Sequence, residues 1–294
     1  MKTKLLQILA FFLPITMFFS QDTFLWRIEN PKNSHVSYLN GTHHYLTSHY
    51  VETFPIIKKK MEEGDAVVFE VDQNISKQNE ELFKKRPDNE KLLAMLTAEQ
   101  RSKAVKHLGE GSLKLTPFQF VGMAAEYNTI YNHPSEKGEN IEKYFLHLSS
   151  SLNKEIIYLE KTQQQIEVFE EISQSGKIAD YLARKSMNQV VDSLGHPTTK
   201  NEMRKSFVKF YDQKQKYYLN VGVPLKYHQT LLKNRNNTWI KLLPEILENH
   251  NAFISVGTMH LQYKFGLIAQ LMKLGYKLTP IDMKTGKDLP FETK

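Results

Sequence analysis

The sequence predicts an α/β fold in which a mixed central β-sheet, built from both ends of the chain, is flanked by helices and a largely helical middle region acts as a cap. Strand-like apolar runs gather near the two ends of the 294-residue chain. Between them, apolar residues recur at the three- and four-residue spacing that is typical of helices. The chain closes with a strand-helix-strand pattern over residues 252–281. No change in composition marks a boundary, so we expect residues 21–294 to form a single domain.

The N-terminal part is predicted to be rich in strands. Residues 24–29 alternate in polarity and, after a turn, residues 36–40 continue as an extended run, which together predict a hairpin. A helix is expected to follow and to end by residue 63. Residues 66–72 form the next predicted strand, whose apolar run is interrupted only by Glu70 and Asp72. These two carboxylates are two residues apart and therefore lie on the same face of that strand.

The middle of the chain is predicted to be helical, with one strand inside it. Helices are predicted over four segments: residues 88–96, 97–108, 117–132 and 141–153. A strand is expected at residues 155–160, and further helices over residues 162–172 and 177–247. The closing pattern then comprises a strand at residues 252–256, an amphipathic helix ending at Gly275 and a strand at residues 277–281.

The first 20 residues have the pattern of a secretory signal peptide. Lys2 and Lys4 precede an apolar stretch of residues 5–19, too short to span a bilayer comfortably, and cleavage is expected after Ser20 or Gln21. An uncleaved anchor is the alternative. The sequence therefore predicts an exported protein, periplasmic or secreted, with no stable membrane span after cleavage. With no cysteine, it lacks disulfides, a lipid-acceptor thiol and thiolate metal sites.

The positive charge of the chain does not indicate a nucleic-acid partner. The net charge is +7, but the lysines are scattered along the sequence and are not interleaved with aromatic residues. We interpret them as a solvated basic surface and expect a peptide or small-molecule substrate. The sequence does not indicate an oligomeric state.

Two matched motifs are the strongest functional signal. Each is a strand-like apolar run followed by Gly-Thr-x-His: Gly41 to His44 near the start, and Gly257 to His260 near the end. The 13 glycines and 11 histidines of the chain would give less than one Gly-x-x-His by chance spacing. A glycine permits a sharp turn at the end of a strand, so the following side chains would lie beyond the carboxyl edge of the sheet, where α/β proteins bind ligands. The alternative is a pair of capping turns with exposed histidines.

Four side chains share this placement at strand ends: His44, His260, Glu70 and Glu160. Two imidazoles and one or two carboxylates form a plausible nitrogen and oxygen site for a divalent ion such as Mn, Co, Zn or Fe. Such an ion polarises a carbonyl and lowers the pKa of bound water, and a free carboxylate would shuttle the proton. Alternatively, Glu70 is a structural ion-pair partner.

These residues, together with Arg235, resemble the TraB/GumN (Tiki-like) family, which is related to erythromycin-esterase-like and haem-binding ChaN-like proteins. The resemblance rests on motifs that occur in the family's order between Leu25 and Ile281: Gly41-Thr42-His43-His44, Val67 to Asp72, Leu159-Glu160 with Gln165, Arg235-Asn236, and Val256 to His260. It implies an α/β fold with flanking helices and an active site at the paired motifs.

The resemblance also implies roles for single residues. His44, His260 and Glu70 would be the catalytic residues and metal ligands, and Arg235, which periodicity alone places on a polar helix face, would hold a substrate carboxylate or an oxyanion. Glu160 is a further binding candidate. His43 departs from the family, which usually has an apolar residue there, and is either an extra ligand or a surface change.

Three functions follow from these observations. The first is an exported metal-dependent hydrolase, a peptidase as the animal Tiki members are regarded to be. The second is a metal-independent esterase-like hydrolase in which a histidine is the base and Glu70 orients it. The third is a non-catalytic protein of the same fold that binds haem, a metal or a peptide.

Overall fold

The computed structural model describes residues 23–43, 47–72, 86–130, 138–174, 177–195 and 229–291. Several predictions fall on residues outside these ranges. They are the signal peptide at residues 1–20, the histidine His44, and the part of the predicted helical region at residues 196–228.

A six-stranded mixed sheet forms the centre of the protein. In chain order its strands are β1 (Leu25–Glu29), β2 (Val36–Thr42), β3 (Ala66–Phe69), β4 (Glu155–Tyr158), β5 (Ala252–Gly257) and β6 (Lys277–Pro280). Their order across the sheet is β4-β3-β5-β2-β1-β6. β1 is antiparallel to both of its neighbours, whereas β2, β3, β4 and β5 are parallel. β1 and β2, which come first in the chain, and β5 and β6, which come last, belong to this one sheet. This confirms the predicted α/β fold built from both chain ends.

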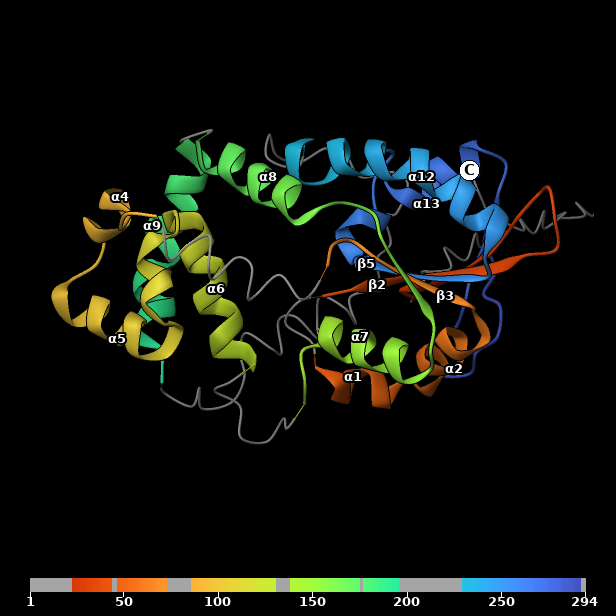
Figure 1. Cartoon of the computed structure of the whole chain (residues 1–294), viewed down its shortest axis with the longest axis horizontal. Helices are drawn as coiled ribbons and strands as arrows, with labels where there is room; N and C mark the ends of the chain where they lie inside the picture. The colour runs from red at the N-terminus through yellow and green to blue at the C-terminus, as the bar shows by residue number, and fades with distance from the viewer. Residues whose placement is uncertain are drawn as a thin grey trace, which may run out of the picture.

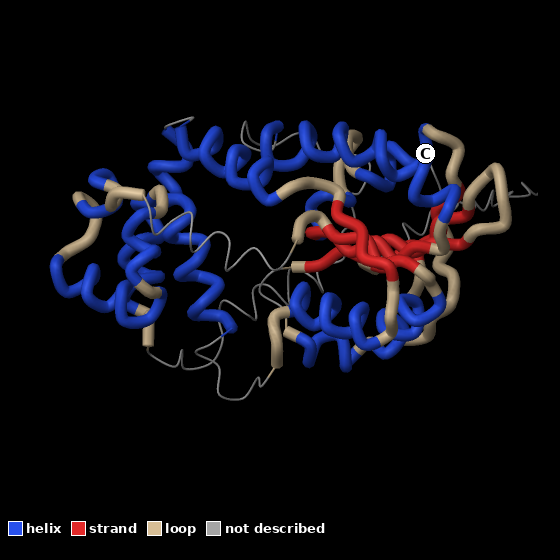
Figure 2. The backbone as a smooth tube through the Cα atoms, in the orientation of Figure 1, coloured by secondary structure: helices blue, strands red, loops and turns tan. Residues whose placement is uncertain are grey.

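Helices cover both faces of the sheet, as Figure 2 shows. On β5, neighbouring side chains point to opposite faces, so Phe253 packs in one buried cluster and Ile254 in another. The Phe253 face is covered by α1 (Ser48–Thr53), α2 (Pro55–Glu63) and α7 (Ile141–Ser151). The Ile254 face is covered by α12 (Arg235–Asn249) and α13 (Leu267–Lys273). Because β3 and β5 are buried on both sides, their sequences are almost wholly apolar.

The middle of the chain forms a helical group beside the sheet (Figure 1). Its elements are α4 (Glu90–Leu93), α5 (Ala98–Leu108), η1 (Glu110–Lys114), α6 (Pro117–Ile130), α8 (Thr162–Gln174) and α9 (Lys177–Asp192). Helix α5 starts at a capping box, in which Thr97 accepts from the amide of Gln100 and the Gln100 side chain accepts from the amide of Thr97. Phe120 of α6 and Val191 of α9 lie in a buried cluster of this group's own.

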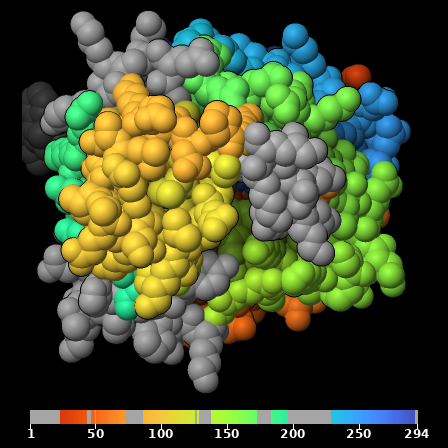
Figure 3. Space-filling view, turned by 60° about the vertical axis from the view of Figure 1, so that its left-hand side comes forward, coloured from red at the N-terminus to blue at the C-terminus, as the bar shows by residue number. Residues whose placement is uncertain are grey.

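The helical group lies next to the sheet layers on the face of the molecule seen in Figure 3, where α5 and α6 (yellow) of this group are on one side and α7 (green), which covers the sheet, is on the other. This matches the expected helical middle region placed against the sheet. None of the helices in the described part of the chain combines the length and the apolar character that a membrane crossing requires.

Candidate functional site

The pairing of β2 with β5 brings the two Gly-Thr-x-His motifs together. The strands are parallel, and the register places Gly41 opposite Val256 and Thr42 opposite Gly257. Both motifs therefore begin at the same carboxyl edge of the sheet. His43 is the first residue after β2 and is partly exposed, whereas His260 is buried in the 3-10 helix η3 (Thr258–Leu261), which follows β5. His44 lies outside the described residues.

Both motif glycines are needed for close approach rather than for a sharp turn. Neither has a positive φ angle, so neither adopts the left-handed backbone conformation by which a glycine permits a sharp turn. A Cβ atom at Gly41 would lie 3.1 Å from Cα of Thr258, and one at Gly257 would lie 3.2 Å from Oε1 of Glu70. The absence of side chains thus lets one motif pack on the other and lets the Glu70 carboxylate reach the backbone.

The two predicted strand glutamates lie side by side just beyond this edge. Glu70 directly follows β3, and Glu160 lies two residues after β4. The amide of Glu160 donates to the carbonyl of Glu70 at 2.9 Å, which extends the parallel pairing of these strands. The Glu70 carboxylate accepts from the amide of Gly257 through Oε1 at 2.5 Å. Glu70 therefore links β3 to the start of the second motif.

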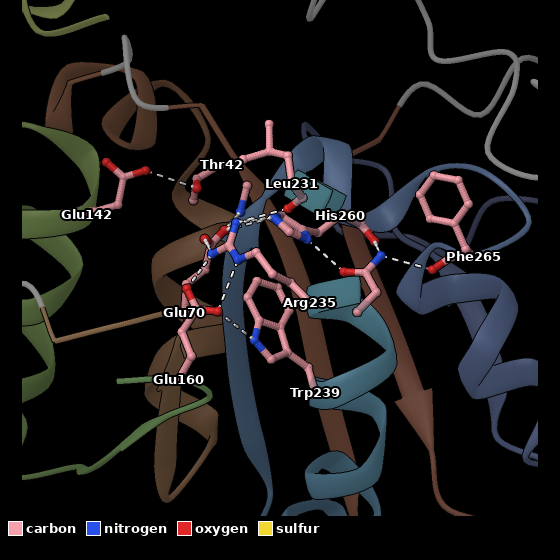
Figure 4. A network of polar contacts seen from close by, with 11 residues as sticks. Thr42, Glu70, Glu142, Glu160, Leu231, Arg235, Trp239, His260 and Phe265 are labelled. Atoms are coloured by element: carbon pink, nitrogen blue, oxygen red, sulfur yellow. Dashed lines mark hydrogen bonds and ion pairs between the residues drawn. The ribbon is translucent and has the colours of Figure 1, made fainter. Parts of the chain in front are cut away.

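Arg235 binds both carboxylates in the interior of the protein (Figure 4). Its Nη2 lies 2.6 Å from Glu70 Oε2 and 2.7 Å from Glu160 Oε1, and its Nε donates to Glu160 Oε2 at 3.0 Å. The side chain is only 6% exposed. Arg235 is the first residue of α12 and follows a π-helical turn, η2 (Gln229–Asn234), a distortion that is frequent at functional sites.

Trp239, one turn along α12, packs against Arg235 and His260 and also contacts Glu160. Its ring centroid lies 4.6 Å from the guanidinium carbon of Arg235 and 4.4 Å from the ring centroid of His260. Its indole N–H donates to Glu160 Oε2 at 3.2 Å. The ring therefore offers a cation–π surface to Arg235, and its one polar atom is satisfied by Glu160.

Burial and charge shift the pKa values of this cluster. Burial opposes the charged form of Arg235, but the attraction of Glu70 and the hydrogen bonds and charge of Glu160 outweigh it, so the pKa of Arg235 lies above its ordinary value. Burial raises the pKa of Glu160, and the hydrogen bond and charge of Arg235 offset this only in part. Two carboxylates share one guanidinium, so the group has a formal net charge of −1 that favours a bound cation.

The hydrogen bonds of His260 assign its tautomer. Arg235 Nη1 lies 3.0 Å from Nε2 of His260, and because a guanidinium only donates, Nε2 must be the acceptor. The proton then belongs to Nδ1, which lies 2.6 Å from Oδ1 of Asn236. We therefore assign the Nδ1–H form, with the Nε2 lone pair facing the carboxylate cluster.

Two of the predicted metal ligands have a separation that suits an ion, but Arg235 lies against both of them. His260 Nε2 and Glu70 Oε1 are 3.8 Å apart, and bonds of about 2 Å let one ion bridge donors up to roughly 4 Å apart. The described residues contain no group of three His, Cys, Asp or Glu side chains that could hold a metal. An ion at these two donors would require Arg235 Nη1 to leave the Nε2 lone pair, and His44 is the candidate for the missing ligand.

Three residues at this edge were given no role from the sequence, although Asn236 belongs to one of its motifs. Asn236 contacts His260, Trp239 contacts Glu160, and Glu142 of α7 accepts from the Thr42 hydroxyl at 3.1 Å. Trp239 lies in residues 177–247, for which the sequence predicted only a helical structure. For Asn236, the available signal was its position directly after Arg235; nothing in the helix pattern distinguishes Glu142.

This fold and site define an α/β protein with a buried Glu-Arg-Glu cluster and a histidine at the carboxyl edge of its sheet. Comparison with family models identifies the family. The model of the TraB/PrgY/gumN family matches residues 24–280, and the chain belongs to that family. Neither the comparison with curated proteins nor the comparison with solved structures found a significant match.

Proposed function

We propose that the protein is an exported metal-dependent hydrolase that cleaves peptide bonds. One observation carries the proposal: the parallel pairing of β2 with β5, which starts both Gly-Thr-x-His motifs at one edge of the sheet beside Glu70. Motifs separated by more than 200 residues in sequence share a site only through the fold. Buried polar groups at such an edge cost stability, and a functional role is the common reason for them.

The residues take distinct roles in this proposal. His260 and Glu70, with His44, hold a divalent ion such as Mn, Co or Zn, which when bound supplies Lewis-acid polarisation of the scissile carbonyl and an activated water. Arg235 pairs with Glu70 and balances its charge. When it leaves the Nε2 lone pair of His260, its guanidinium donates to a substrate carboxylate or to the developing oxyanion. Glu160 and Trp239 hold Arg235 close to the site by the contacts described above.

Peptide cleavage by the purified chain from Gln21 onward tests the proposal. We expect hydrolysis of a fluorogenic peptide library with added Mn²⁺, Co²⁺ or Zn²⁺, and its loss in chelator. His260→Ala and Glu70→Gln should each lower the rate by at least about 100-fold. The control is His147→Ala, because His147 is exposed on α7, and its rate should stay within about twofold of the unmodified chain.

The same assay separates the rival functions. Activity that persists in chelator but is lost in His260→Ala would exclude the metal and favour an esterase-like hydrolase with His260 as base. The Nε2 lone pair that faces the cluster favours this second candidate, although Asn236 rather than Glu70 would then orient the ring. No hydrolysis of peptides or esters, with a change in visible absorbance on adding haem, would instead support a binding protein.

Export is part of the proposal and has its own test. The intact mass of the protein recovered from an expression host with a secretory pathway should correspond to a chain that begins at Gln21 or Asp22. A full-length mass in the membrane fraction would support the uncleaved anchor instead.

A further inference from the structure

The amide of Asn236 has only one orientation that satisfies its surroundings. Its Nδ2 donates to the carbonyl of His260 at 3.0 Å and to the carbonyl of Phe265 at 2.9 Å. Both partners are carbonyl oxygens and only accept, so a flipped amide would place an oxygen against two acceptors. The side chain is fully buried. Its Oδ1 is therefore held against Nδ1 of His260.

This fixed acceptor determines where the His260 ring carries its proton. An oxygen 2.6 Å from Nδ1 requires a proton there, because two lone pairs would otherwise face each other. Arg235 imposes the same result from the opposite side of the ring, where Nε2 accepts from Nη1. Of these two constraints, the one from Arg235 is lost whenever an ion or a substrate takes the Nε2 lone pair. The one from Asn236 remains.

We infer that Asn236 is a positioning residue that keeps His260 in the Nδ1–H tautomer, so that Nε2 presents its lone pair to the site. The second ring nitrogen of a histidine that binds a metal characteristically donates to such a partner, which fixes the ring and its tautomer. Asn236 also ties the segment from His260 to Phe265 to α12 through its two donor contacts. The tautomer assignment stands without the proposed function; its effect on metal binding and hydrolysis rests on that function.

Two variants separate the acceptor role from the anchoring role. Asn236→Asp keeps an oxygen next to Nδ1 but loses the donors to both carbonyls. Asn236→Leu has a similar volume and loses both. If Asn236 acts only as an anchor, the two variants should resemble each other. If it positions the ring, only Asn236→Leu should release the tautomer once Arg235→Met has removed the donor to Nε2. Asn237→Leu is the matched control, since Asn237 is the neighbouring asparagine on the exposed face of α12.

The experiment is ¹⁵N NMR of the imidazole side chains in chelator-treated protein, with His260 assigned from a His260→Gln sample. A protonated ring nitrogen resonates well apart from an unprotonated one. In chelator the Arg235 donor still holds Nε2 as an acceptor, so the Asn236 and Asn237 variants are made in an Arg235→Met background. We expect a proton on Nδ1 in the unmodified chain, in Arg235→Met alone, and in Arg235→Met combined with Asn237→Leu or Asn236→Asp. We expect a mixture of tautomers in Arg235→Met combined with Asn236→Leu. An Nδ1 without a proton in the unmodified chain, in Arg235→Met alone or in Arg235→Met with Asn236→Asp would overturn the inference, as would an unchanged tautomer in Arg235→Met with Asn236→Leu. Circular dichroism verifies folding, and if the chain with both Arg235→Met and Asn236→Leu does not fold, Arg235→Met alone still decides, because Asn236 is then the one that remains of the two constraints on the ring.

Calorimetric titration with Zn²⁺ alone then tests the consequence for the site. Asn236→Leu should bind Zn²⁺ roughly 10- to 100-fold more weakly than the unmodified chain, with a matching loss of peptide hydrolysis. Asn236→Asp should lose less, and Asn237→Leu should not change. A chain that shows the expected tautomer but neither binds Zn²⁺ nor hydrolyses peptides would refute the proposed function and leave the tautomer assignment standing. Equal affinity in Asn236→Leu and the unmodified chain would refute the positioning role.

Discussion

Replacing Arg235 with methionine removes the guanidinium that bridges Glu70 and Glu160. The three side chains are 6%, 10% and 5% exposed, respectively, so water replaces the lost partner poorly. Breaking a buried ion pair by removing one member costs about 3–5 kcal/mol, because a buried charge is left uncompensated. We expect the free energy of unfolding of Arg235→Met at neutral pH to fall by that amount.

The loss should depend on pH in a defined direction. In the unmodified chain, burial already raises the pKa of Glu160, and Arg235 is the main influence that lowers it. Without Arg235 the folded-state pKa rises further above the unfolded value. A carboxyl with a raised folded-state pKa binds more protons in the folded state, so stability falls as pH rises between the unfolded and the folded pKa values. The deficit of Arg235→Met should therefore be largest at neutral pH and should shrink on acidification.

Urea denaturation followed by tryptophan fluorescence measures both effects, because Trp26 and Trp239 are fully buried. Arg184→Met is the control: Arg184 is exposed on α9, and we expect a change within about 0.5 kcal/mol. The double variant Arg235→Met with Glu160→Gln should regain part of the loss, since the amide carries no charge. A deficit below about 1 kcal/mol at neutral pH, or one that grows on acidification, would refute the reasoning.

Three further changes test other contacts. Gly41→Ala should lower the free energy of unfolding, measured by urea denaturation, by about 1–3 kcal/mol, because its Cβ would crowd the backbone of Thr258. The control Gly111→Ala has no atom within 4 Å of the new Cβ and should leave stability unchanged or slightly raised. Equal effects of the two changes would contradict the packing argument. Trp239→Phe keeps a ring but removes the donor to Glu160. We expect the free energy of unfolding to fall by about 1–3 kcal/mol at neutral pH and by less in acid. A loss independent of pH would assign the effect to packing alone. Burial and the nearby Asp72 raise the pKa of Tyr158 from 10.0 to about 12, so the free energy of unfolding should decline as pH rises between these values. In Tyr158→Phe it should decline less steeply. Parallel curves of stability against pH for the two chains would show that Tyr158 does not titrate in this way.

Local sequence patterns predicted the elements of this fold well because hydrophobic periodicity is a property of neighbouring residues. The predicted helix at residues 97–108 is found as α5 (Ala98–Leu108), and the predicted strand at residues 252–256 as β5 (Ala252–Gly257). Strand order was not predicted, because nothing local to β3 or β2 indicates that β5 lies between them. The meeting of both chain ends in one sheet was predicted from the strand-like runs that gather near the two ends of the chain.

The polar site was harder to predict than the fold. Periodicity alone places Arg235 on a solvated helix face, but it is buried because Glu70 and Glu160, far away in sequence, supply its partners. The family resemblance identified Arg235 where the pattern did not. Leu242 shows the opposite case: it is an apolar residue of the same helix, yet it is 41% exposed. Partners that are distant in sequence decide both cases, and a single sequence does not encode them in any local signal.

The central position of β5 has a consequence for how the protein matures during its synthesis. β2 and β3 both emerge from the ribosome early, yet each must wait for the strand that separates them, which is made near the end of translation. Until then the edges of β2 and β3 that face β5 have no native neighbour, and Glu70 lacks the amide of Gly257. A nascent or truncated chain that stops before Ala252 thus lacks an assembled site, so whatever chemistry the finished protein performs is withheld until almost its entire length has been made.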